Sequence, residues 1–131
     1  MSAQSPYLYY ANSDIGGRGV FSIKDLHKGE IIESCPVIIM PKEQIPILDQ
    51  TVLYDYYFLW GDFHCAIALG FGSLYNHQIG SNADYVMDTD NDTIDFFCVK
   101  DIKAGEEITI NYNGDPNNDE LVWFQLDKKK R

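Results

Sequence analysis

The stretch GFGSLYNHQIGSNADY, residues 70–85, follows an apolar, strand-like run and differs sharply from it in composition. It holds glycines, an adjacent Asn-His pair and a second asparagine, with an aromatic residue near each end. Strands favour β-branched and aromatic side chains and disfavour glycine and asparagine. The purpose of these residues must therefore be sought in the segments that accompany them along the chain.

The chain has 131 residues, the length of one domain that buries roughly two-thirds of its unfolded surface. Apolar residues make up 45%, which is typical of a globular protein and not of a disordered one. The net charge is -10, and four of the ten basic residues lie in the tail Lys128–Arg131. The acidic body disfavours direct nucleic-acid binding and favours cationic partners, although such a charge serves solubility alone in many proteins.

Cysteine usage indicates a reducing compartment. Cys35, Cys65 and Cys98 cannot all pair and form no C-x-x-C spacing, and nothing favours a Cys-His nucleophile. The N-terminus lacks a signal-peptide pattern, and no run approaches the ~20 apolar residues of a membrane span. We expect no membrane association and an intracellular protein, either nuclear and chromatin-associated or cytoplasmic. The Lys128–Arg131 tail is expected to be a solvated end, with a nuclear address or a phosphate contact as alternatives.

Short β-branched and aromatic runs broken by Gly, Asn and Asp predict a mainly β protein. Strands are expected at 19–23, 30–40, 54–60, 64–69, 83–88, 93–100 and 107–110. Gly61-Asp62 and the tetrapeptide TDND at 89–92 predict two hairpin turns. The single expected helix follows Asp119, which would cap the sequence ELVWFQLDKKK. No linker divides the chain, so residues 1–131 are expected to form one domain.

Two segments of the chain repeat each other. Residues 21–33, FSIKDLHKGEIIE, align without a gap with residues 97–109, FCVKDIKAGEEIT. Each segment predicts a strand, a turn closed by Gly29 or Gly105, and a second strand. The pair suggests several small sheets related by pseudo-repetition, unless the same turn chemistry has simply been used twice.

Two familiar ligand motifs are excluded. Asp88, Asp90 and Asp92 resemble the start of a calcium loop, but Thr93 and Val99 stand where the loop needs glycine and glutamate. The glycine pairs of GRG and GFG lack the third glycine of a dinucleotide loop and are not followed by a βαβ pattern. A Rossmann-like dinucleotide-binding architecture is therefore excluded.

Three segments taken together resemble the signature segments of SET-domain protein lysine methyltransferases. They are GRGVF at 17–21, LYNH at 74–77 with Ser81-Asn82 shortly after, and GEEITINY at 105–112. The stretch ALGFGSLYNH, residues 68–77, is especially similar to the small stand-alone SET proteins of large DNA viruses. The resemblance runs from about Gly16 to Tyr112, in the family's order and spacing.

The resemblance implies a SET fold (β-clip) of several small sheets, with a pseudoknot formed by the segments carrying Asn76-His77 and Tyr112. The core would span about residues 16–113, followed by a closing segment at 114–127 with a short C-terminal helix, and by the basic tail at 128–131. An Asn and a His at such a crossing can bond buried backbone and cofactor together, satisfying groups that would otherwise cost about 1–3 kcal/mol each.

The same resemblance implies S-adenosylmethionine as the cofactor. Its binding residues would be Arg18, Gly19 and Val20 through their backbone, Asn76 and His77 at the amino acid and adenine portions, Tyr112, and Trp123 covering the adenine. Purely structural roles for Asn76-His77 and for Trp123 remain the alternatives.

Tyr112 matches the family's essential tyrosine, and Tyr56 is the second catalytic candidate. The channel for the substrate lysine would be lined by Tyr56, Tyr85, Ile110 and Tyr112, although tyrosines in strands are often packing groups. Two departures from the family pattern occur, Gln78 for the usual Cys and Ser81 for the usual Pro. The cysteine triad of zinc-bearing members is absent, so no metal site is predicted.

The sequence thus predicts a SET methyltransferase that acts on lysine in a protein or peptide, with a histone tail as one candidate. An extended basic peptide suits the acidic body and can add as a strand along a groove. A catalytically idle SET module that binds basic peptides is the alternative, followed by an unrelated β-rich binding protein. A homodimer that helps to shape the peptide groove is a further hypothesis.

Overall fold

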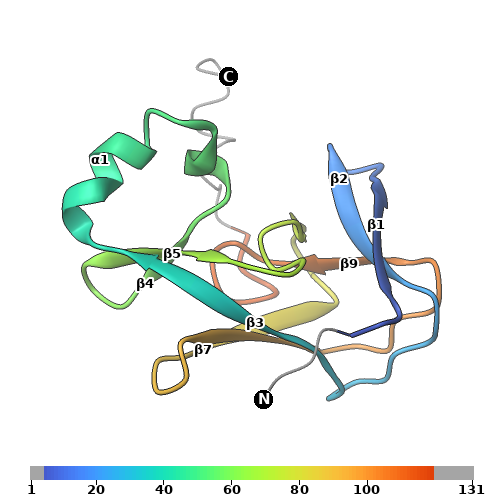
Figure 1. Cartoon of the computed structure of the whole chain (residues 1–131). Helices are drawn as coiled ribbons and strands as arrows, with labels where there is room; N and C mark the ends of the chain where they lie inside the picture. The colour runs from blue at the N-terminus through green and yellow to red at the C-terminus, as the bar shows by residue number, and fades with distance from the viewer. Residues whose placement is uncertain (1–4, 120–131) are drawn as a thin grey trace.

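The computed structural model describes residues 5–119, which are mainly β as predicted (Figure 1). Two sheets carry the strands: one of four in the order β1-β2-β9-β6, and one of five in the order β4-β5-β3-β8-β7. The elements in chain order are β1 (Leu8–Asn12), β2 (Arg18–Ser22), β3 (Ile31–Met40), η1 (Lys42–Gln44), α1 (Ile45–Leu48), η2 (Val52–Asp55), β4 (Phe58–Trp60), β5 (His64–Ala68), β6 (Asn76–His77), β7 (Ala83–Asp88), β8 (Thr93–Cys98) and β9 (Glu107–Ile110).

The two repeated segments pack against each other. At their centres Leu26 and Ile102 form an isolated antiparallel bridge, with N–H to O distances of 2.7 and 2.9 Å. Both side chains are buried in the core. The repeat detected in the sequence is therefore a structural one, since it joins the beginning of β3 and the beginning of β9 to a common centre.

The turn residues of the repeat serve the same joint. Gly29 and Gly105 both have positive φ, 87° and 84°, which a residue with a side chain adopts only at a cost. The Gly29 N–H donates to Cys98 O at 2.8 Å, and the Gly105 N–H donates to Ser22 O at 3.0 Å. Each turn thus anchors itself on the other unit.

The equivalent aspartates cross the joint as well. Asp25 accepts a hydrogen bond from the Ala104 N–H, and Asp101 accepts one from the Lys28 N–H, both at 2.9 Å. The shared Lys-Asp pair is thus more than good turn chemistry, because its carboxylates bond the opposite unit and hold the two sheets in place.

The five-stranded sheet curls until its edges approach each other. Its edge strands are β4 and β7, yet the ring of Phe58 on β4 lies 5.3 Å from the ring of Tyr85 on β7. Phe96, fully buried on β8, contacts both rings. The curl brings the aromatic rings of Phe58, Tyr85 and Phe96 together on one side of the sheet.

The segment of the opening quotation connects the two sheets. β6 pairs in parallel with β9, with Asn76 opposite Thr109 and His77 opposite Ile110. The N–H of Gly80 donates to Pro116 O at 2.7 Å. The segments carrying Asn76-His77 and Tyr112 are thus bonded side by side, as the expected crossing requires.

Gly72, in the same segment, lies where no side chain fits. A Cβ there would stand 2.6 Å from Ala68 Cβ, 3.0 Å from Cys35 Sγ and 3.2 Å from Phe96 Cε2. Gly72→Ala is therefore expected to lower the free energy of unfolding by about 1–3 kcal/mol through overpacking. Gly16→Ala is the matched control, because a Cβ at Gly16 has no neighbour within 4 Å. Urea denaturation tests the pair, and equal stabilities of the two variants would contradict this packing.

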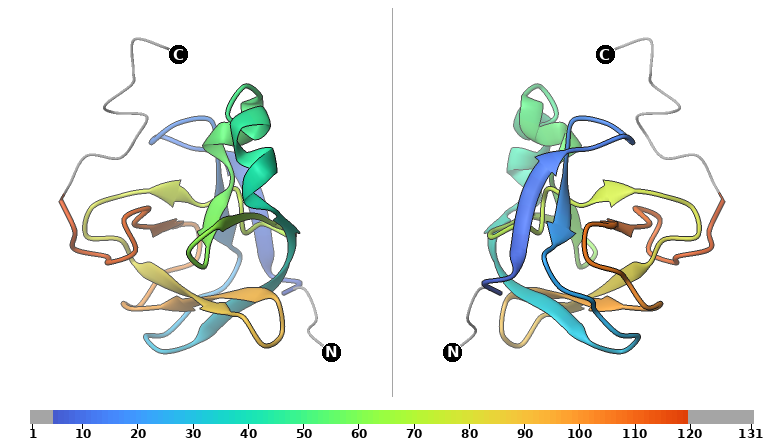
Figure 2. Two further views of the ribbon diagram at one scale, coloured as in Figure 1. Left: turned by 90° about the vertical axis from the view of Figure 1, so that its left-hand side faces the viewer. Right: turned by 90° about the vertical axis from the view of Figure 1, so that its right-hand side faces the viewer.

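Both hairpins are confirmed, but three expectations about elements were wrong or incomplete. β1 and the two-residue β6 were not predicted as strands. Residues 54–60 do not form one strand, because 3-10 helix η2 extends to Asp55 and β4 begins at Phe58. A helix occurs before the late one expected: α1, with η1 and η2 on either side, projects beyond the strands (Figure 2). The predicted helix after Asp119, with Trp123, lies outside the described residues.

No helix within residues 5–119 has both the length and the apolar character needed to traverse a bilayer.

Candidate active site

Two pockets lie next to each other. The first, here called the aromatic pocket, has a volume of about 430 Å³ and is lined by Tyr54–Leu59, Gly72, Ser73, Tyr75, Tyr85, Met87 and Tyr112–Gly114. The second, here called the glycine-loop pocket, has a volume of about 280 Å³ and is lined by Ile15–Arg18, Asp55, Tyr56, Ser73, Leu74, Asn76, His77 and Tyr112.

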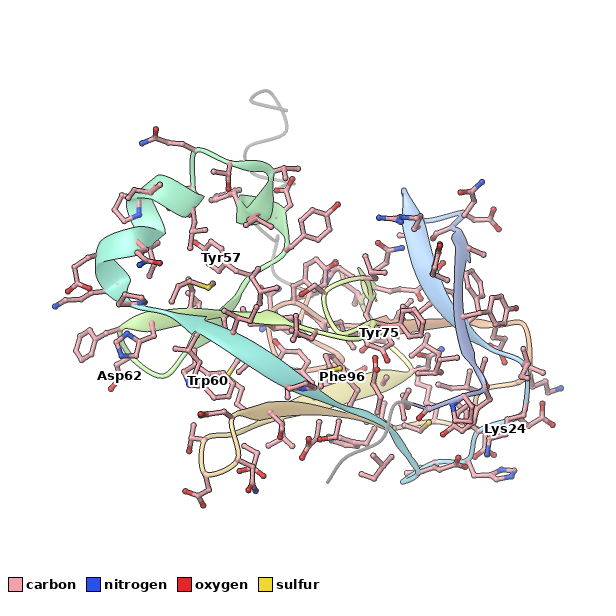
Figure 3. All side chains as sticks on the ribbon, in the orientation of Figure 1. Lys24, Tyr57, Trp60, Asp62, Tyr75 and Phe96 are labelled. Atoms are coloured by element: carbon pink, nitrogen blue, oxygen red, sulfur yellow. The ribbon has the colours of Figure 1, made fainter. Side chains whose placement is uncertain are left out.

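Four residues line both pockets: Asp55, Tyr56, Ser73 and Tyr112. These residues border both pockets, so groups bound in the two pockets would lie close to the same four side chains. In Figure 3, Tyr57 lies beside α1, whereas Tyr75 and Phe96 lie near the centre of the molecule. Tyr56 and Tyr112, both predicted from the sequence as site residues, therefore lie where the aromatic pocket and the glycine-loop pocket adjoin.

Tyr112 is held from both ends. Its hydroxyl donates to Tyr75 O at 2.7 Å, and its backbone N–H donates to His77 Nδ1 at 3.0 Å. Burial, followed by the neighbouring Tyr56 and Glu107, raises the pKa of the Tyr112 phenol. Tyr112 therefore stays a neutral phenol at physiological pH. Its proton is directed at the Tyr75 carbonyl, and a phenol oxygen is in general able to accept a hydrogen bond as well as donate one.

Tyr75 fixes the acceptor of that hydrogen bond. Its side chain is fully buried, its ring lies 4.5 Å from the ring of Phe96, and its hydroxyl donates to Glu33 Oε1 at 2.6 Å. Burial raises the pKa of Glu33 above that of an ordinary carboxyl group. The Tyr75 backbone is thereby anchored on the core. Sequence reasoning did not select Tyr75 or Glu33.

The remaining channel candidates have different surroundings. Tyr85 lines the aromatic pocket, and burial, followed by the charge of Asp84, raises its pKa. Tyr56 is 38% exposed and so stands at the mouth of both pockets. Ile110 is fully buried and lines neither pocket. It lies on the same side of β9 as Ile108, and both side chains belong to the core.

Three residues of the GRGVF segment were expected to touch a cofactor. Arg18 lines the glycine-loop pocket, whereas Gly19 and Val20 do not. Val20 is fully buried in the core. Gly19 is small for another reason: a Cβ there would lie 2.7 Å from Glu107 Cδ and 3.2 Å from Asn76 Nδ2. The missing side chain leaves space for the carboxylate of Glu107.

The side-chain amide of Asn76 has only one orientation that satisfies its neighbours. Its Nδ2 lies 3.1 Å from Gly16 O, 3.1 Å from Arg18 O and 2.8 Å from Glu107 Oε2. All three partners are acceptors, so the nitrogen must face them. The amide oxygen is consequently the atom of Asn76 that remains for a donor in the glycine-loop pocket.

His77 is neutral in the folded protein. Its Nδ1 accepts the Tyr112 N–H, and burial lowers its pKa. As pH falls below the ordinary histidine value of about 6.5, the unfolded chain gains a proton that the folded state resists. The free energy of unfolding is therefore expected to carry a component that is full above this pH and is lost as pH falls towards the folded-state pKa.

His77→Asn tests this expectation, because an asparagine oxygen can replace Nδ1 as an acceptor without titrating. Urea denaturation between pH 5 and 7.5 should give a smaller acid-side loss of stability for His77→Asn than for the wild type. Raised carboxyl pKa values, such as that of Glu33, act in the opposite direction and are common to both proteins. Identical pH dependences would contradict the assignment.

Among residues 5–119, no group of three or more His, Cys, Asp or Glu side chains is arranged to hold a metal ion. The aspartates that resemble a calcium loop form the turn between β7 and β8, where Asp88 accepts hydrogen bonds from the N–H groups of Asp90 and Asn91. Their function is to cap a hairpin.

Comparison with known proteins agrees with this architecture. The family model described as "SET domain" matches residues 17–113. The "Histone-lysine N-methyltransferase, H3 lysine-37 specific" of Schizosaccharomyces pombe is 34% identical over 110 residues, which cover 83% of this chain and 71% of that protein. A solved structure of a Plasmodium falciparum protein, described there as a candidate histone methyltransferase, superimposes with a TM-score of 0.72. It has 31% identity, and the match covers 92% of this chain and 98% of that one.

The order of the strands, the bonded β6 and β9 segments and these matches lead to one conclusion. The chain belongs to the SET-domain family, and its class of enzyme is the protein-lysine N-methyltransferases.

Proposed function

We propose that the protein transfers a methyl group from S-adenosylmethionine to the side-chain amine of a lysine in a protein substrate. The observation that supports this most strongly is that two pockets of different character share Tyr112. The methyl donor would occupy the glycine-loop pocket and the lysine the aromatic pocket. S-adenosylmethionine supplies the reactive methyl group, bound to a positively charged sulfur.

The residues of the glycine-loop pocket fit such a donor. The amino acid portion of S-adenosylmethionine carries an ammonium group, which needs acceptors, and the oriented oxygen of Asn76 supplies one. The carbonyls of Gly16 and Arg18 already accept from Asn76 Nδ2, so the loop is shaped before the donor arrives. Pre-arranged polar groups of this kind bind without a further cost of ordering.

The aromatic pocket suits a lysine that must lose its charge before it reacts. The unperturbed lysine pKa of about 10.4 leaves roughly one amine in a thousand uncharged at neutral pH, a deficit of about 4 kcal/mol. A bound lysine in a channel lined by Tyr54, Tyr56, Tyr57 and Tyr85 would have less contact with water, which would disfavour its ammonium form. The channel also restricts the side chain to an approach along one line, which favours in-line transfer.

Tyr112 would position the amine and not remove its proton. A phenol with a raised pKa is a poor base at neutral pH, but its oxygen can accept a hydrogen bond from the amine. The Tyr112 proton is directed at Tyr75 O and Tyr112 lines both pockets, so the amine would approach the oxygen from the side away from that carbonyl. The excess proton of the lysine would leave to solvent before transfer.

A basic, extended protein segment is the proposed substrate, with a histone tail the first candidate because of the histone methyltransferase relative. The body of the chain is strongly acidic, and Asp55 lies at the wall of both pockets. β4 and β7, both edge strands, contribute Phe58 and Tyr85 to the aromatic pocket, so a peptide adding along either edge passes the channel mouth. A histone substrate would place the protein at chromatin.

The experiment is transfer of a labelled methyl group to core histones and to an array of lysine peptides, alongside a direct measurement of cofactor binding. Binding together with transfer to at least one basic substrate is expected. Cofactor binding without transfer to any substrate would favour an idle peptide-binding SET module. Absence of cofactor binding would contradict the proposal. Sedimentation of the active protein tests the homodimer hypothesis, which a monomer throughout the active concentration range would reject.

A further inference from the structure

Glu107 occupies the point where three segments of the glycine-loop pocket meet. It lies at the start of β9, opposite Phe21 of β2. One carboxylate oxygen accepts from Asn76 Nδ2 at 2.8 Å, and the other accepts from the hydroxyl of Ser13. A carboxylate suits this position because both of its oxygens are acceptors.

Ser13 extends the contact to the loop that lines the pocket. Besides donating to Glu107, its hydroxyl oxygen accepts from the N–H of Ile15 at 3.0 Å and lies 3.4 Å from the N–H of Gly16. Ile15 and Gly16 both line the glycine-loop pocket. Glu107 therefore holds the loop from one side and the Asn76 amide from the other.

The approach of Glu107 is built into the backbone. Gly19 has no side chain at the one place where a Cβ would collide with the carboxylate. The antiparallel pairing of Val20 with Ile108 fixes the distance between β2 and β9. The backbone carbonyl of Glu107 accepts from Asn82 Nδ2 at 2.9 Å, which ties the main chain of the residue as well.

We propose that Glu107 is a positioning residue for the methyl donor: it fixes the amide of Asn76 so that the amide oxygen faces the donor's ammonium group. This inference rests on the proposed function, and it assigns to Glu107 an action through Asn76, without contact with the reacting atoms. Glu107 does not line the glycine-loop pocket, whereas Asn76 does.

Glu107→Gln isolates the effect, because glutamine has the same size but only one acceptor atom. It cannot accept from both Ser13 and Asn76. When its nitrogen faces Asn76, two NH₂ groups oppose each other, which works against the amide orientation that Gly16 O and Arg18 O alone would still favour. Rotation of that amide would turn a donor towards the ammonium group, so binding of an ammonium-bearing ligand is expected to weaken about fivefold to tenfold.

The test uses calorimetry with two ligands, S-adenosylhomocysteine and 5′-methylthioadenosine, of which only the first carries the amino acid portion. Glu106→Gln is the matched control: it removes the same charge, but Glu106 is exposed and accepts only from the Lys103 N–H in its own turn. Glu107→Gln is also measured in the Asn76→Ala background. Thermal unfolding of each variant verifies that it is folded.

The proposal expects Glu107→Gln to lower the affinity for S-adenosylhomocysteine and to leave the affinity for 5′-methylthioadenosine within about twofold of the wild-type value. In the Asn76→Ala background, Glu107→Gln should not lower either affinity further. An equal loss of affinity for both ligands would overturn the proposal, and so would an undiminished loss in the Asn76→Ala background. Either outcome would indicate general damage to the pocket. If Glu107→Gln does not fold, Ser13→Ala replaces it. This variant removes one restraint on Glu107 and should cause a smaller loss, again selective for S-adenosylhomocysteine; an unselective loss overturns the proposal.

Failure of this inference is distinguishable from failure of the proposed function. If the wild type binds S-adenosylhomocysteine but Glu107→Gln binds it equally well, only the positioning role is wrong. If the wild type binds neither ligand, the assignment of the glycine-loop pocket to a methyl donor is wrong.

Discussion

Tyr112→Phe is expected to lower kcat for methyl transfer by at least about 100-fold, the size of loss that follows removal of a single pre-oriented polar group at a reacting centre. The substitution keeps the ring that separates the two pockets. It removes only the hydroxyl that donates to Tyr75 O, so the amine loses the oxygen that would orient it. The lost hydrogen bond should reduce stability by about 1 kcal/mol, which leaves the protein folded.

The measurement is single-turnover transfer to the best peptide from the array, with cofactor binding determined in parallel. Cofactor affinity should change little, because the phenylalanine ring fills the same wall. Tyr9→Phe is the control: Tyr9 lines neither pocket, and its ring stacks on Phe21 at 5.5 Å. A Tyr112→Phe variant with wild-type kcat would mean that the hydroxyl does not act on the amine.

Asn76→Ala has the second largest expected effect, a loss of cofactor affinity of about 10- to 100-fold. A hydrogen bond to a charged group contributes about 1.5–3 kcal/mol, and alanine removes the oxygen that would receive the ammonium. It also removes the one donor shared by Gly16 O, Arg18 O and Glu107 Oε2. Both changes act on the same pocket, so the loss should be larger than that from Glu107→Gln.

Calorimetry with S-adenosylhomocysteine measures this loss, and Asn91→Ala is the matched control. The side chain of Asn91 bonds only Asp88 in the exposed turn between β7 and β8, so its removal should leave cofactor affinity unchanged. Equal affinities of Asn76→Ala and the wild type would remove Asn76 from the donor site.

The sequence predicts well those parts of the fold that local chemistry decides. The tetrapeptide at 89–92 forms the predicted turn between β7 and β8, where Asp88 pairs with Thr93. Each repeated segment has a glycine at its turn, Gly29 or Gly105, and both glycines adopt the positive φ that the turn requires. These features depend on residues close in sequence or on a pattern present twice.

The failures concern segments whose structure depends on distant contacts. The run Tyr54-Asp55-Tyr56-Tyr57 has high strand propensity, but it begins within a 3-10 turn that Thr51 caps, and its rings surround a pocket. β1 becomes a strand because β2 is available beside it, with five residue pairs in register. Strand propensity alone does not show whether a partner strand or a cavity lies beside a segment.

The candidate site shows the same division. Tyr56, Tyr112, Asn76 and His77 stood out because they match family motifs. Glu107 lies in the GEEITINY segment but was not singled out, and in the repeat it stands where the first segment has Ile31. Because Ile31 is exposed, the repeat alone gives no reason to expect a partner for Glu107, and its partners Asn76 and Ser13 come from distant parts of the sequence.

A crystal structure with S-adenosylhomocysteine and a lysine-bearing substrate peptide tests the central claim most directly. The account predicts the cofactor product in the glycine-loop pocket, the lysine side chain in the aromatic pocket, and the amine within about 3–3.5 Å of the Tyr112 hydroxyl oxygen. Binding of both ligands on the same side of Tyr112, or of the lysine outside the aromatic pocket, would contradict it.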